Sequence, residues 1–195
     1  VSAEDRGLAV QLINRALNVD PNNAHALATL GFVYCHMFKD FDQSAEKLAA
    51  ARRSDPNNAW AWIYQGALHA FMGRGPEAEQ CCDEARACSP VDPAGHFFDR
   101  IAATAAFTNQ RYDRAIELAL RSRRGDKYSA SAVRVLAMSL LLSGQKDKAA
   151  EVAAELQRIE PGLTVQGYLA RTPAAKYEVG QRCAEALRGL GFPEH

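Results

Sequence analysis

A proline-containing motif recurs along the chain at a nearly constant spacing, and this recurrence restricts the possible fold more than any other feature. Asp-Pro-Asn-Asn occupies residues 20–23 and again 55–58, Ser-Pro-Val-Asp follows at 89–92, and Glu-Pro at 160–161 lies two periods further on. The period is about 34 residues, the length of one helix–turn–helix unit. Proline ends the preceding helix, and the Asn or Asp that follows it can cap the next one. Each motif therefore predicts a short turn between two antiparallel helices.

The residues between the motifs have helical periodicity. Leu27, Leu30, Gly31 and Tyr34 are separated by three or four residues, as on the buried face of one helix. The second helix of each unit carries small residues such as Ala78 that let two helix axes approach closely. Val and Ile are sparse and form no long runs, so we expect no strands. The sequence therefore predicts an all-α fold.

Residues 62–90 carry Trp62, Gly66, Ala78, Ala85 and Pro90, and this pattern resembles the tetratricopeptide repeat. The resemblance implies a right-handed α-solenoid of antiparallel helix pairs, about four and a half repeats long. It departs from the family pattern in the unit at 91–127, whose first helix lacks the Trp–Leu–Gly signature. The first full unit has one extra residue near its turn. We expect a half repeat at 1–21, repeats at about 22–56, 57–90, 91–127 and 128–161, and C-terminal capping helices at 162–195.

The two ends of the sequence give an expectation about context. The half repeat at the start suggests a piece of a longer protein. Residues 187–194, together with 160–164 and Ser-Pro-Val-Asp-Pro at 89–93, resemble the C-terminal end of certain bacterial multidomain proteins. Those proteins carry a class III adenylate/guanylate cyclase domain or a winged-helix transcription-factor domain before their repeats. The resemblance implies a regulatory interaction module of a signalling protein; the alternative is a free-standing assembly scaffold.

Composition and motifs argue against several functional classes. Basic and acidic residues balance at 23 each, so no strong field would attract nucleic acid or an anionic membrane. The five cysteines form no paired CxxC framework, which favours reduced thiols and a cytoplasmic location. No HExxH, phosphate-loop or GxSxG motif occurs. We therefore predict no catalytic, metal or cofactor site, and a protein that is not an enzyme.

A cluster of basic residues ends the weak third full repeat. It consists of Arg121, Arg123, Arg124 and Lys127, at the predicted C-terminal end of a helix. Cations there offset the helix dipole, which is the favoured interpretation, and contact with an acidic partner or nucleotide is the alternative.

Stacked helix pairs form a concave face lined by the first helix of each pair, and a protein or peptide would bind there. The partner could be another domain of the same polypeptide. Ala28 and Phe32 replace polar groups that chaperone-binding relatives use to hold a carboxylate, so we expect an apolar groove for an amphipathic helix. Packing of Phe32, Trp60 and Phe71 by neighbouring helices is the alternative. The predicted groove residues are His25, Phe32, His36, Trp60, Ile63, Ala67, Phe71, Arg134 and Met138.

Overall fold

The computed structural model describes residues 2–195, and all regular structure in that range is helical. This confirms the predicted all-α fold. The α-helices are α1 (Ala3–Val19), α2 (Ala24–Val33), α3 (Phe41–Ser54), α4 (Ala59–Phe71), α5 (Gly75–Cys88), α6 (Gly95–Thr108), α7 (Tyr112–Gly125), α8 (Ala130–Leu142), α9 (Lys146–Ile159), α10 (Val165–Arg171) and α11 (Glu178–Gly189). A π-helical turn, η1, spans Tyr34–Phe38, and a 3-10 turn, η2, spans Pro173–Lys176.

The Asp-Pro-Asn-Asn motifs form helix boundaries. The side chain of Asn23 accepts a hydrogen bond from the amide of Ala26 at the start of α2. Asn58 does the same for the amide of Ala61 at the start of α4. These bonds satisfy amide groups that have no partner within their own helix. The repeated sequence therefore produces the same N-cap twice.

The turn inside each helix pair also recurs. Lys39, Gly73, Gln110 and Gly144 occupy matching positions between the two helices of successive pairs, and all four have φ between 56° and 83°. This left-handed conformation ends a helix at least cost when glycine adopts it. In the first pair, η1 directly precedes the turn and accommodates the extra residue of that repeat.

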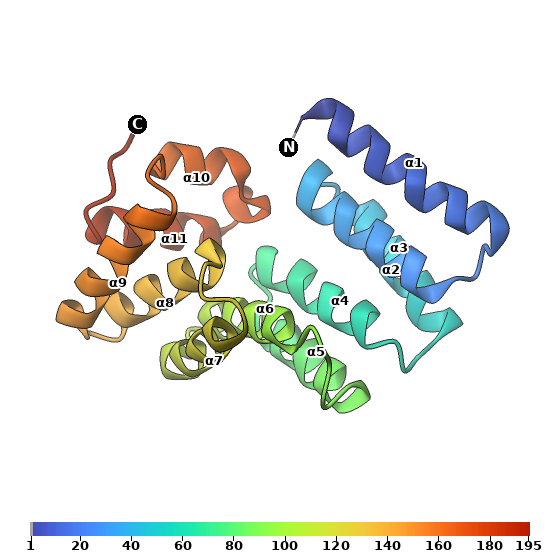
Figure 1. Cartoon of the computed structure of the whole chain (residues 1–195), viewed down its shortest axis with the longest axis horizontal. Helices are drawn as coiled ribbons and strands as arrows, with labels where there is room; N and C mark the ends of the chain where they lie inside the picture. Colours follow the sequence, from blue (N-terminus) through green and yellow to red (C-terminus); the bar gives the residue numbers. More distant parts are fainter. Residues whose placement is uncertain (1) are drawn as a thin grey trace.

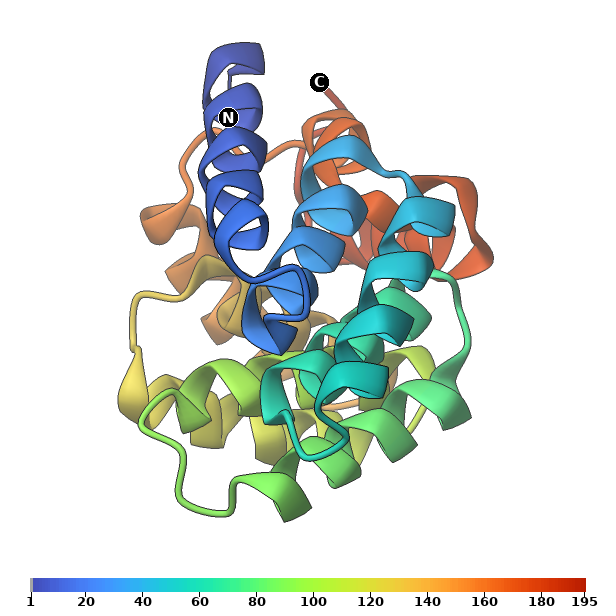
Figure 2. The ribbon, with the colours of Figure 1, turned by 90° about the vertical axis from the view of Figure 1, so that its right-hand side faces the viewer.

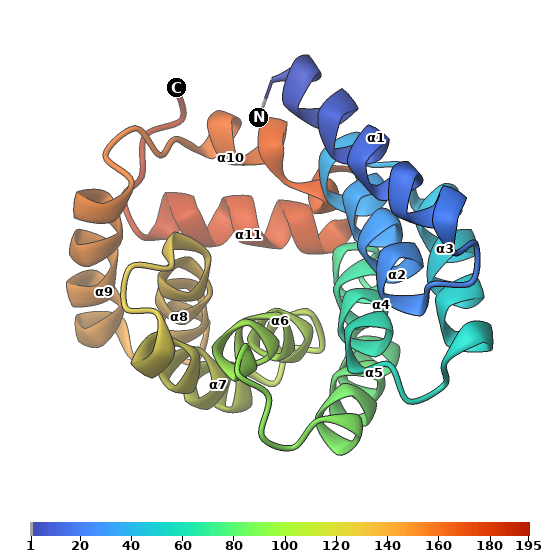
Figure 3. The same ribbon diagram turned by 45° about the vertical axis from the view of Figure 1, so that its right-hand side comes forward.

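The helix pairs stack into an arc with two layers. The first helices α2, α4, α6 and α8 contact one another in sequence on the inner side, and α3, α5, α7 and α9 form the outer layer (Figures 1 and 3). Figure 2 shows α1 beside α2, on the same side of the molecule as the C-terminal segment. No helix within residues 2–195 has the length and apolarity needed to cross a membrane.

The C-terminal elements run back across the inner side of the arc (Figure 3). Helix α11 packs on α8, while η2 reaches α4 and η1 in the first half of the chain. The face of α11 expected to cover the stack is buried, including Val179, Cys183 and Leu187. The C-terminal segment therefore covers the last repeat and also bridges the two arms of the arc.

Candidate functional site

A cavity of about 620 Å³ lies between the concave face and the C-terminal segment. Its walls come from η1, the end of α4, α6, α8 and the segment α10–η2–α11. This volume is within the range of ordinary ligand pockets. Side chains from many separate parts of the chain line this one space, so the cavity is the candidate site.

Three long-range contacts close one side of the cavity. Lys39 Nζ donates a hydrogen bond to the carbonyl oxygen of Ala170 at 2.7 Å. The rings of Phe41 and Tyr177 meet edge to face, with centroids 5.5 Å apart. A guanidinium nitrogen of Arg182 donates to the carbonyl oxygen of Thr108 at 3.2 Å. Together these contacts hold the C-terminal segment against the first and third repeats.

The cavity brings together several of the predicted groove residues. Its lining includes Phe32, His36, Phe71, Arg134 and Met138, which come from α2, η1, α4 and α8. Phe32 also stacks on Tyr64, with ring centroids 4.4 Å apart, so one of its faces is packed.

Three predicted groove residues are buried. Met138 is 2% exposed and belongs to a core cluster, although it borders the cavity. Ile63 and Ala67 are 0% and 1% exposed and belong to the core cluster formed by the first three helix pairs. On α4 both side chains face neighbouring helices. The periodic pattern of apolar residues does not indicate how closely the inner helices pack against one another. The structure therefore assigns both residues to the core rather than to a binding surface.

His25 and Trp60 lie outside the cavity, in an aromatic cluster. The Trp60 ring lies 5.3–5.5 Å from the rings of Tyr64, Phe97 and Phe98, and His25 meets its edge at 5.8 Å. Packing by neighbouring helices, the alternative left open by the sequence, applies to Trp60.

The cavity is more basic than the expected apolar groove. The basic side chains Arg6, Lys39, Arg100, Arg134 and Arg171 line it. Of these five residues only Arg134 was predicted, because the group comes from separate parts of the chain, namely α1, the turn after η1, α6, α8 and α10. A purely apolar helix therefore does not match the charge of the cavity walls.

Two of these arginines share one carboxylate. Glu160 accepts hydrogen bonds from Arg134 at 2.7 Å and pairs with Arg171 at 2.6 Å. Although burial raises the pKa of Glu160, the two guanidinium groups outweigh that effect and hold the pKa below its usual value. Arg134 also lies over the ring of Tyr168, at 5.5 Å from its centroid. This pairing fixes Arg134 at the cavity wall.

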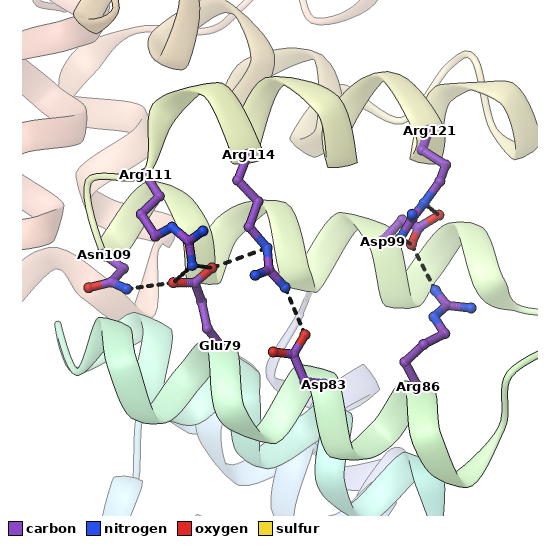
Figure 4. A network of polar contacts seen from close by, with 8 residues as sticks. All are labelled: Glu79, Asp83, Arg86, Asp99, Asn109, Arg111, Arg114 and Arg121. Atoms are coloured by element: carbon purple, nitrogen blue, oxygen red, sulfur yellow. Dashed lines mark hydrogen bonds and ion pairs between the residues drawn. The ribbon is translucent and has the colours of Figure 1, made fainter.

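A second polar network lies outside the cavity, between α5, α6 and α7 (Figure 4). The carboxylate of Asp99 accepts hydrogen bonds from Arg86 and Arg121 at 2.6–2.8 Å. Glu79 receives Asn109 and pairs with Arg111 and Arg114. Both carboxylates are only 6% exposed and each is paired with two arginines, so this network joins neighbouring repeats.

The basic cluster after the third repeat contributes to the same joints. Arg121 pairs with Asp99, and Arg123 pairs with Glu155 on α9 at 2.6 Å. These pairs connect neighbouring repeats, in agreement with a structural role for the cluster.

Within residues 2–195, no group of three or more His, Cys, Asp or Glu side chains is arranged to hold a metal ion. The cysteines are free thiols, and four of them are buried. Burial raises the pKa of Cys35 to about 12 and that of Cys183 to about 11. Such thiols are poor nucleophiles at neutral pH.

An arc of stacked helix pairs around a concave site is the architecture of a helical-repeat protein, a class built to bind other proteins. A family model described as tetratricopeptide repeat matches residues 39–93 and 102–163, more than half of the chain. The chain therefore belongs to the tetratricopeptide-repeat family, whose members mediate protein–protein interactions.

Several solved structures share the fold. PilW, a widely conserved type IV pilus biogenesis factor, is 23% identical with a TM-score of 0.71, covering 96% of this chain and 85% of PilW. Pseudomonas aeruginosa PilF is 21% identical with a TM-score of 0.66, covering 96% of this chain and 83% of PilF. YrrB, a tetratricopeptide-repeat protein with an unusual peptide-binding site, is 14% identical with a TM-score of 0.59, covering 91% and 90%. A search of curated proteins finds no match.

Proposed function

We propose that this protein is an interaction scaffold that holds a segment of a partner protein in its concave cavity. The observation that carries the proposal is the convergence of side chains from four helix pairs and the C-terminal segment around one space. A segment in the cavity would contact all of these elements at once. The peptide-binding site described for YrrB supports a protein segment as the occupant.

A free-standing assembly scaffold is better supported than the regulatory module of a cyclase-type or winged-helix protein. PilW and PilF share the fold over 96% of this chain, which includes most of the C-terminal segment, and PilW is a type IV pilus biogenesis factor. No finding supports the cyclase or winged-helix context that the C-terminal sequence suggested. A cytoplasmic location stays a prediction from the five free thiols.

Site-specific photocrosslinking tests the proposal. A photoreactive benzoylphenylalanine replaces Phe71, which lines the cavity, or Leu120, which is exposed on the outer helix α7. After irradiation in the cells that produce the protein, position 71 should give a discrete crosslinked partner and position 120 should not. Crosslinks of equal yield at both positions, or at position 120 alone, would exclude the cavity as the binding surface.

A further inference from the structure

Positively charged side chains gather at the cavity, although the net charge of the chain is zero. Five basic side chains line it, whereas none of its described lining residues is Asp or Glu, and the formal net charge of the chain is zero. Glu160, which does not line the cavity, pairs only with Arg134 and Arg171. The remaining charge is therefore available to an anionic group that enters the cavity.

Three basic residues of the cavity wall, Arg6, Lys39 and Arg100, form no ion pair within residues 2–195, and Arg100 is the one on an inner helix. It projects from α6, donates one hydrogen bond to Ser131 Oγ at 3.0 Å and lies 4.5 Å from the ring centroid of Phe97. In the described part of the chain, no ion pair joins it to a carboxylate. Burial lowers the pKa of Arg100, and Asp126 and Tyr64 only partly offset this effect. A partly desolvated guanidinium of this kind gains from an incoming carboxylate.

Several half-buried arginines outside the cavity are paired with carboxylates. Arg86 and Arg121 share Asp99, and Arg123 has Glu155. Arg100 has no such carboxylate partner where it lines the cavity. Its free donors therefore mark the position at which a ligand carboxylate would complete the pairing.

Apolar side chains form another part of the wall, beside polar ones such as His36, Thr104 and Thr108. Phe71, Phe107 and Met138 lie between the basic residues. We infer that the cavity binds a partner segment in which acidic residues flank an apolar one, with an internal acidic side chain held by Arg100. This inference rests on the proposed function, since it names the chemistry of the segment that the cavity would hold.

The arrangement favours protein over nucleic acid. Nucleic-acid sites usually form an extended basic surface that follows successive phosphates, and the protein or domain is commonly basic. Here the cations surround one cavity with apolar walls in a chain of zero net charge. An acidic segment with an apolar residue matches both parts of that wall.

Fluorescence polarisation with synthetic peptides tests the inference. The probe is a short labelled peptide of alternating Asp and Leu, acetylated and amidated so that it carries no terminal charge. The control peptide replaces every Asp by Asn. The acidic peptide should bind more tightly, and its affinity should fall as salt rises. Equal binding of the two peptides, or no binding of either, would overturn the inference.

Variants locate the bound carboxylate. Arg100→Gln should weaken binding of the acidic peptide about tenfold, the scale of a lost charge-assisted hydrogen bond, and Arg100→Lys should weaken it less. Arg158→Gln, on an exposed position of α9, is the matched control and should bind as the parent does. Unchanged affinity in Arg100→Gln would contradict the inference, as would stronger competition by a single-stranded RNA of equal charge.

Circular dichroism would detect a folding defect in Arg100→Gln. In that case a second variant tests the inference. The side chain of Arg171 is 61% exposed, so Arg171→Gln should fold normally and bind the acidic peptide roughly threefold more weakly. An unchanged affinity there would also count against the inference. Crosslinking from position 71 separates the two proposals: a crosslinked partner without preference for the acidic peptide would leave the proposed function standing and remove this one.

Discussion

At the scale of single residues, the closest helix crossings depend on glycine. A Cβ atom at Gly66 would lie 2.8 Å from Cys82 Sγ and 3.2 Å from the carbonyl oxygen of Ala78. Gly31 has the same role against Leu48 in the preceding pair. We expect Gly66→Leu to lower the free energy of unfolding by about 1–3 kcal/mol, because the crossing between α4 and α5 would be overpacked. Urea denaturation measures the change.

Gly7 provides the matched control for that substitution. It lies in the middle of α1, and a Cβ atom there would meet nothing within 4 Å. Gly7→Leu should raise stability by up to about 1 kcal/mol, since glycine is a poor helix former. If both variants unfold at the same urea concentration as the parent, the assigned crossing at Gly66 is wrong.

The cysteines should differ in reactivity according to burial. Cys88 is half-buried, and the other four thiols are buried with raised pKa values. With a thiol reagent at pH 8, we expect one reactive cysteine in the native protein and all five after denaturation. Cys88→Ser should remove the native reaction, and reductant should not shift the melting temperature. A melt that moves with reductant would reveal a disulfide and contradict the free thiols.

At the scale of the elements, the network in Figure 4 joins the second and third repeats. Asp99 is buried and receives two arginines, one from α5 and one from α7. Asp99→Ala would leave both guanidinium groups without their acceptor and should cost about 1–3 kcal/mol of stability in urea denaturation.

Asp83 is the natural comparison for Asp99. It accepts from Arg114 at 2.7 Å, but its side chain is 63% exposed. Asp83→Ala should therefore cost less than about 1 kcal/mol. A loss at Asp83 as large as that at Asp99 would show that burial does not control the strength of these joints.

The elements themselves could be predicted from sequence because their signals are local. Proline and asparagine mark helix boundaries within a few residues, and the stripe around Leu30 and Gly31 identifies a buried face. The joints between repeats were not predictable in this way. Asn109 and Arg111, the partners of Glu79, lie 30 and 32 residues further along the chain. Helical periodicity carries no information about such pairs.

At the scale of the whole molecule, the cavity depends on contacts that sequence patterns do not reveal. Lys39 and Ala170 are separated by 131 residues, and their hydrogen bond helps to close the arc. Phe32, Phe71 and Met138 lie off the packing stripe of the inner helices and line the cavity, although Met138 is buried. Ile63 was misplaced because that stripe gives no measure of how closely the inner helices pack. The basic lining depends on the closed arc and was therefore missed.

Buried thiols and phenols should make the protein sensitive to alkali. Burial raises the pKa of Cys35 and of Tyr64 to about 12, from ordinary values of 9.0 and 10.0, and that of Cys183 to about 11. The unfolded chain therefore loses these protons first. Their contribution to stability is complete below about pH 9 and falls as the pH rises towards 12.

The expected slope is about 1.4 kcal/mol per pH unit for each such group once the unfolded chain has ionised. Urea midpoints measured between pH 8 and pH 11 would show it. Cys183→Ala should have a shallower decline than the parent, because one buried thiol is absent. A stability that stays constant up to pH 11 would contradict the burial of these groups.

Methyl spectra of the methionines report most directly on whether the concave cavity binds a partner segment. The chain has three methionines, of which Met37 and Met138 line the cavity and Met72 does not. With ¹³C-labelled methionine methyl groups, titration with the acidic peptide or with the crosslinked partner's segment should shift the Met37 and Met138 signals and leave Met72 in place. A shift of Met72 alone, with Met37 and Met138 unchanged at saturation, would place binding outside the cavity.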